Sequence, residues 1–148
     1  MTPINVGKIQ DFIDMGRLPY KKDVPLTMKD LVESGMLKSN AIKFGVKLLG
    51  DGKEKFRSPI NIEISRASKS AIDAIEAAGG TITTVHYNKL ALRALLKPDK
   101  FDIIPRRAKP PPKLMPYYTE YENRGYLSPE VQRRELMAKI EGEERQDA

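Results

Sequence analysis

The sequence contains no cysteine and only one histidine, His86. Without cysteine the chain can form neither a disulfide framework nor a thiolate metal site. This fits a reducing compartment without establishing one. A single histidine likewise excludes a His-rich metal site and a proton relay through two imidazoles. Because no other metal-ligand spacing is present, we predict no metal and no cofactor.

Long apolar runs are also missing. No run approaches the roughly 20 residues that a helix needs to cross a bilayer. The first residues, MTPINVGKIQDF, show neither the charged-then-apolar pattern of a signal peptide nor the Arg/Ser-rich character of a transit peptide. We therefore expect no membrane partner. Either the protein carries no cleaved targeting segment, or that segment is missing from this sequence.

Motifs typical of enzymes are absent as well. The glycine-containing stretch 45–52 matches neither a P-loop nor a dinucleotide-binding fingerprint. The serines within 65–70 lack a nucleophile-elbow pattern and are explained as helix caps. His86 has no acidic neighbour in sequence, and we interpret it as a surface or half-buried histidine. We predict no catalytic residues and no small-molecule substrate; the alternative is a small enzyme with a pocket around His86 or Glu63.

Positive charge is what the chain has in excess. The formal net charge is +6, and the sequence pI is about 9.5. Such a balance favours a polyanionic partner, most simply nucleic acid. The excess lies within residues 1–125, whereas residues 126–148 hold more acidic than basic groups. We therefore expect a nucleic-acid surface on the body and the proline-rich stretch, and not on the C-terminal segment.

The densest structural signal lies in residues 45–86. Alternating apolar and polar side chains, as in Ile60, Ile62 and Ile64, predict a strand with one buried and one wet face. Because helical and strand patterns alternate along the chain, we predict an α/β or α+β fold with a small irregular sheet and flanking short helices. The expected helices are 5–17, 27–34, 68–78 and 88–96, and the expected strands are 46–49, 60–64 and 81–86, with at best an edge strand at 24–26.

Several polar residues are expected to begin these helices. The side-chain oxygen of Asn5 is placed to cap the first helix, and Asn88 the last. Thr27, followed by aspartate three residues later, has capping-box spacing. For the helix of the central stretch, Ser68 and Ser70 are equally well placed caps.

The chain changes character near residue 104. The stretch 104–116 is rich in proline and basic groups, which favours an extended conformation that cannot pack a core. We interpret it as a basic arm lying on nucleic acid or on a neighbouring protein, with a PxxP ligand for a small recognition domain as the alternative. Ser128 and Pro129 are then expected to begin a final helix that docks elsewhere. A loop before it, also expected to contact RNA or neighbours, holds Tyr117, Tyr118, Tyr121 and Tyr126.

These signals divide the chain into four parts. We expect an N-terminal helix with a basic loop (1–22), a globular RNA-binding domain (23–100), an extended arm rich in proline and tyrosine (101–127) and a C-terminal helix (128–148). Basic groups beside an aromatic suit RNA, because cations neutralise phosphates while a ring stacks on an exposed base. The candidate RNA-binding residues are Arg17, Lys21, Lys22, Lys47, Lys53, Lys55, Arg57, Arg66, Lys69, Arg106, Arg107, Lys109 and Lys113.

Lys69 is unusual among these cations because it lies at the start of a predicted helix, where the helix dipole disfavours positive charge. A phosphate bound by the helix amides and by this lysine would explain the placement. A solvated lysine tolerated at small cost is the alternative.

Two motifs of the central stretch carry a family resemblance. The stretch reads GVKLLGDG and later INIEISRASKSAIDAIEAAGG. These motifs resemble the C-terminal domain of ribosomal protein fifteen of the large subunit, which pairs a VK-hydrophobic-LG-x-G strand and turn with a later S-x-S-A…I…A-G-G helix. The matching positions are Val46, Lys47, Leu49, Gly50, Gly52, Ser68, Ser70, Ala71, Ile75, Ala78, Gly79 and Gly80.

The flanking sequence extends the resemblance to residues 5–127. VPLTMKDLVESGML matches the family in kind, and IQDFIDMGRL and MPYYTEYENRGYL resemble its mitochondrial branch. The family usually begins with a long extension rich in glycine, arginine and lysine that threads into ribosomal RNA. That extension is absent from this sequence, and mitochondrial members tend to continue past the tyrosine-rich segment. We therefore expect the chain to be a fragment, without the family's main RNA-threading contacts.

The resemblance implies a fold, a role and partners. The expected fold is a ribosomal protein fifteen-like globular domain with an extended arm and a C-terminal helix. The implied role is a non-catalytic, structural one in the large subunit of the mitochondrial ribosome, in the matrix. The implied partners are large-subunit ribosomal RNA and neighbouring ribosomal proteins. The alternative is an RNA-binding protein that acts outside the ribosome.

Overall fold

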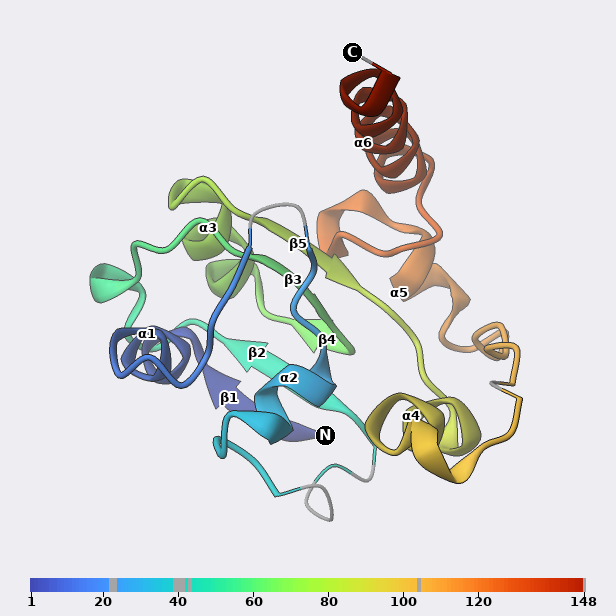
Figure 1. The fold of residues 1–148 in the computed structure, drawn as a ribbon, viewed down its shortest axis with the longest axis horizontal. Helices are drawn as coiled ribbons and strands as arrows, with labels where there is room; N and C mark the ends of the chain where they lie inside the picture. The colour runs from blue at the N-terminus through green and yellow to red at the C-terminus, as the bar shows by residue number, and fades with distance from the viewer. Residues whose placement is uncertain (22–23, 39–41, 43, 104, 148) are drawn as a thin grey trace.

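The computed structural model describes residues 1–21, 24–38, 42, 44–103 and 105–147. Two small parallel sheets lie among short helices, and a long C-terminal helix projects from the body (Figure 1). The strands are β1 (Thr2–Asn5), β2 (Val46–Leu49), β3 (Asn61–Ile64), β4 (Arg66–Ala67) and β5 (Thr81–Thr84). The helices are α1 (Val6–Asp14), α2 (Met28–Glu33), α3 (Lys69–Ala77), α4 (Lys89–Leu96), α5 (Met115–Thr119) and α6 (Pro129–Asp147), with 3₁₀ turns η2 (Lys53–Lys55), η3 (Pro98–Lys100) and η4 (Tyr121–Asn123).

The predicted α/β class is confirmed, and the sheet is more regular than expected. Strands pair in the orders β1-β2-β4 and β3-β5, and every ladder is parallel. Neighbouring parallel strands need a crossover between them, and α3 supplies it between β3 and β5. Ile60, Ile62 and Ile64 are all fully buried and form the centre of the core.

Gly80 is required by the close approach of α3's exit to β3. A Cβ added at Gly80 would clash with the carbonyl oxygen of Ile60, far inside contact distance. The preceding Gly79 has a φ of +88°, which ends the helix in the left-handed region that glycine adopts freely. The Gly-Gly stop is therefore a packing and turn device.

Three of the predicted caps are confirmed. The amide of Thr27 donates to Asp30 Oδ2 at 2.8 Å, which closes the capping box of α2. Ser68 is the cap of α3, and its Oγ accepts from the amide of Ala71. At α4, Asn88 Oδ1 accepts in the same way at 2.8 Å. Each of these caps depends only on residues a few positions apart.

The predicted side-chain cap at Asn5 is wrong. Asn5 precedes α1, but its side chain makes no capping hydrogen bond. The reason is that Asn5 is also the last residue of β1, where it pairs with Leu49 of β2. The strand β1 was itself not predicted, because Pro3 and Asn5 are poor strand formers and only Ile4 is fully buried in it. An edge strand tolerates the proline.

The tyrosine-rich segment also differs from prediction. Tyr117 and Tyr118 lie in α5 rather than in a loop, and Tyr118 is fully buried. Pro110 is buried as well, so this segment does pack against the body. Farther along, Thr84 of β5 and Gly125 form a parallel bridge. Prolines prevent regular structure locally, but they do not prevent the rings that follow them from entering a core.

The C-terminal helix α6 begins as predicted. Ser128 Oγ accepts from the amide of Val131, and Pro129 occupies the first helical position. Val131 is buried against the body, whereas Leu136, Met137 and Ile140 remain exposed as the helix leaves it (Figure 1). No helix within the described ranges combines the length and apolar character that crossing a membrane requires.

Candidate nucleic-acid interface

The predicted RNA-binding cations lie on the surface. Lys22 is outside the described residues; of the others, Arg66 is half-buried and the rest are exposed. Arg17 follows the C-terminus of α1, and Lys21 forms an isolated bridge with Val24. In Figure 1 the turn η2 lies at the far left, and the arm that follows residue 104 lies at the right. The cations therefore form separate groups and not one patch.

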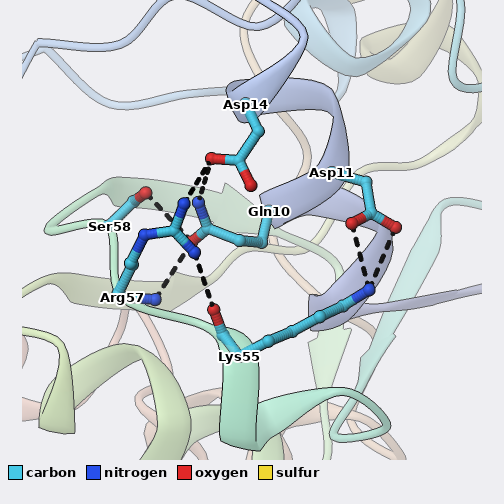
Figure 2. A network of polar contacts seen from close by, with 6 residues as sticks. All are labelled: Gln10, Asp11, Asp14, Lys55, Arg57 and Ser58. Carbon is cyan, nitrogen blue, oxygen red and sulfur yellow. Dashed lines mark hydrogen bonds and ion pairs between the residues drawn. The ribbon is translucent and has the colours of Figure 1, made fainter.

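The loop 53–57 is fastened to α1 by two ion pairs. Lys55 Nζ lies 3.0 Å from Asp11 Oδ1, and an Arg57 guanidinium nitrogen lies 2.9 Å from Asp14 Oδ1 (Figure 2). Exposed ion pairs of this kind stabilise a fold by at most about 1 kcal/mol each. Their larger consequence is electrostatic, because two of the loop's cations already have carboxylate partners. Sequence reasoning treated the whole loop as uncompensated positive charge.

A buried glutamine lies beneath these pairs. Gln10 Oε1 accepts from the amide of Arg57 and from Ser58 Oγ, both at 3.0 Å. Its Nε2 donates to Asp14 Oδ1 at 2.9 Å, so both ends of the amide are used (Figure 2). The loop is therefore held by a buried polar anchor as well as by surface charge. The available sequence signal was that residue 10 shares a helix face with Val6, four residues earlier.

Lys47 and Arg66 are brought together by the first sheet. They are register partners on β2 and β4, although they are far apart in sequence. The guanidinium carbon of Arg66 lies 4.8 Å from the ring centroid of Tyr117, a cation–π contact that holds this arginine against α5. Lys47 remains exposed on the central strand. This pairing was not predictable from spacing.

Lys69 is exposed in the first turn of α3, as expected. The surrounding geometry does not favour the phosphate interpretation. Ser68 Oγ already accepts from one of the free helix amides, and Glu122 lines the same hollow of about 230 Å³ as Lys69. A carboxylate at that position repels an approaching phosphate. Lys69 as an RNA contact therefore stays a prediction.

Arg107 is the arm residue with the most internal contacts. Its guanidinium carbon lies 5.5 Å from the ring of Tyr87 and 5.9 Å from that of Tyr126, and it donates to the Tyr87 hydroxyl at 3.5 Å. Burial raises the pKa of Glu63, and the nearby Arg107 opposes this rise. These contacts tie the arm to the end of β5. Arg106, Lys109 and Lys113 are more freely presented to solvent.

His86 lies beside the buried tyrosine of α5. The rings of His86 and Tyr118 meet edge-on at 5.7 Å, and burial lowers the pKa of His86. Burial also raises the pKa of Tyr118 to about 12. The hollow of about 260 Å³ around His86 is lined, within the described part, by no carboxylate. Over the same ranges, no three His, Cys, Asp or Glu side chains are arranged to hold a metal ion.

Comparison with known proteins matches residues 3–83 to the family described as ribosomal proteins 50S-L15 and 50S-L18e together with their 60S counterpart. The chain belongs to this family. The matched range contains both motifs of the central stretch, together with β1, β2 and α1. The resemblance to ribosomal protein fifteen is thereby confirmed.

Three relatives are named large ribosomal subunit protein uL15m. The one from Neurospora crassa is 48% identical over 97 residues, which cover 66% of this chain and 30% of the relative. That from Schizosaccharomyces pombe is 42% identical over 134 residues, covering 90% and 51%. That from Danio rerio is 35% identical over 130 residues, covering 85% and 44%. The chain thus spans about half the length of these relatives, or less.

Proposed function

We propose that the chain is a structural constituent of the large subunit of the mitochondrial ribosome, in the matrix, where it binds ribosomal RNA and neighbouring ribosomal proteins. The observation that carries this proposal is the similarity to relatives named uL15m in two fungi and a vertebrate, where the suffix denotes the mitochondrial form. The family match and the net charge of +6 support it independently.

The mechanism is charge neutralisation on a rigid scaffold. Each phosphate that a lysine or arginine neutralises releases counterions, so affinity falls with salt by about 0.7 to 0.9 log units per contact. The exposed Lys47 and Lys53 and the arm residues Arg106, Lys109 and Lys113 are the best placed for this. Lys55 and Arg57 share their charge with carboxylates, and Arg66 and Arg107 also hold tyrosines. Because many weak contacts share the binding, no single residue is essential.

The four-part division assigns different tasks to the segments. The body, 1–100, presents basic loops to RNA, and the arm, 101–127, follows RNA or a neighbouring protein while Tyr118 anchors it to the body. The final segment, 128–148, carries acidic groups and exposed apolar side chains, so it contacts protein in preference to RNA. A role as an RNA-binding protein outside the ribosome remains the second candidate, but the names of the relatives do not favour it.

Sedimentation tests the proposal. In mitochondrial extract of the organism that encodes the chain, an epitope-tagged copy should travel with the large subunit through a sucrose gradient and should resist a mild salt wash. When low magnesium splits the ribosomes, the tag should remain with the large subunit and leave the small one. Recovery of the tag only in free fractions would overturn the ribosomal role.

A further inference from the structure

The exposed side of α4 carries a stripe of cations outside the groups considered so far. Lys89, Arg93 and Lys97 follow one another at intervals of four residues, so they lie on one face of the helix, and Lys100 follows on η3. All four are exposed, and no ion pair in the described part of the chain involves any of them. Like charges at this spacing repel one another, and a bound polyanion would relieve that repulsion.

The stripe borders a hollow with an apolar floor. The hollow has a volume of about 470 Å³, and all four cations line it together with Leu92, Leu96 and Phe44. Phe44 is 64% exposed, which is unusual for a phenylalanine. Phe44 and Lys89 also line the adjacent hollow of about 260 Å³ that contains His86 and Tyr87. Aromatic rings and cations therefore interleave along one surface, and the described lining of both hollows holds no carboxylate.

We propose that this surface binds unpaired nucleotides of RNA, with a base stacked on Phe44 and the flanking phosphates along Lys89, Arg93 and Lys97. The proposal rests on the function proposed above and names the class of RNA that this face takes. Single-stranded RNA needs flat rings for its bases and cations for its backbone, and both are present here. A duplex keeps its bases stacked and would use the cations alone.

Binding by the purified 148-residue chain tests the idea. The probes are a fluorescein-labelled oligo(A) of about ten nucleotides and a blunt RNA duplex of the same length, followed by fluorescence anisotropy at several salt concentrations. The single strand should bind more tightly than the duplex. Phe44→Leu should weaken single-strand binding about tenfold and leave duplex binding unchanged, whereas Phe44→Tyr should retain both. Equal affinities for the two probes, or no effect of Phe44→Leu, would overturn the proposal.

A charge variant with a matched control isolates the stripe. Replacing Lys89 and Lys97 together by glutamine should reduce the salt slope for the single strand by about 1.4. Replacing Arg133 and Lys139 of α6 by glutamine removes the same charge from an exposed helix and should leave the slope unchanged. Circular dichroism should show the same fold for all variants, since every substituted side chain is exposed. Equal slopes for the two double variants would contradict the assignment.

The occupant in the assembled particle can be identified by crosslinking. A photoreactive phenylalanine analogue at position 44, in the large subunit, should crosslink to RNA; a crosslink to protein alone would mean that a neighbouring protein occupies the surface. Failure here is distinguishable from failure of the ribosomal role. A chain that sediments with the large subunit but shows no Phe44 effect disproves only this inference, whereas one that binds oligo(A) through Phe44 but stays in free fractions disproves the ribosomal role.

Discussion

The phenolic hydroxyl of Tyr118 donates a hydrogen bond to the carbonyl oxygen of Ser65 at 2.9 Å, between residues 53 positions apart. Tyr118 is fully buried, and the rings of Tyr117, His86 and Tyr126 meet it edge-on at 5.1 to 5.9 Å. Edge-on aromatic pairs add about 0.5 to 1.5 kcal/mol beyond the burial of area. This one side chain therefore attaches the tyrosine-rich segment to the strand region around β4.

Removing that hydroxyl should be measurable. We expect Tyr118→Phe to lower the free energy of unfolding by about 1 to 2 kcal/mol, because the buried carbonyl of Ser65 loses its donor while the ring packing remains. Urea denaturation followed by circular dichroism measures the change. Tyr121→Phe serves as the control, since Tyr121 is 40% exposed, and it should change stability by less than about 0.5 kcal/mol. Equal effects of the two variants would mean that the Tyr118 hydrogen bond contributes nothing.

The second prediction concerns the buried amide in Figure 2. Gln10→Leu keeps the approximate size of the side chain but leaves the amide of Arg57 and the hydroxyl of Ser58 without their acceptor. We expect a loss of about 2 to 4 kcal/mol in the free energy of unfolding, because buried donors that lose their partners are costly. Gln132→Leu, at an exposed position of α6, is the matched control and should be nearly neutral. A stable Gln10→Leu variant would show that the amide is dispensable.

The third prediction is a pH dependence at Glu63. Burial raises its pKa above the ordinary value of 4.5, with Arg107 opposing and Glu135 reinforcing the rise. A carboxyl with a raised folded pKa contributes stability that is fully present below its unfolded pKa and is lost as the pH rises through the folded pKa. Glu63→Gln should therefore be more stabilising, relative to the native chain, at about pH 7 than at about pH 4. Thermal unfolding at the two pH values tests this, with the exposed Glu54→Gln as a control that should show no such difference.

The fourth prediction concerns the two ion pairs between α1 and the loop 53–57. If this loop faces RNA, replacing Asp11 and Asp14 by asparagine should release the charge of Lys55 and Arg57 and tighten binding to large-subunit ribosomal RNA severalfold at about 0.1 M salt. Filter binding of the purified chain measures the change. Glu130→Gln combined with Glu141→Gln adds the same charge on α6. An equal gain from that control would mean that only net charge is sensed and that the loop does not contact RNA.

Sequence reasoning succeeded where the determinants are local. The capping box of Thr27 and the cap at Asn88 depend on residues three positions away, and the alternation of β3 is readable within five residues. It failed where distant segments decide. The partner of Lys55 lies 44 residues away and that of Arg57 43 residues away, so an apparently free basic loop became a paired one. For the same reason, residue type predicted a basic surface, whereas the stripe on α4 emerged only from the hollow it borders.

The parallel bridge between Thr84 and Gly125 has a consequence for the unfinished chain. The amide of Thr84 donates to the carbonyl of Arg124 at 2.8 Å, and the carbonyl of Thr84 accepts from the amide of Tyr126 at 2.9 Å. Until residue 126 has been synthesised, this end of β5 presents unpaired backbone groups that invite pairing with another chain. The tyrosine-rich segment thus guards the sheet against aggregation, and a chain cut before it would lose that protection before any RNA was met.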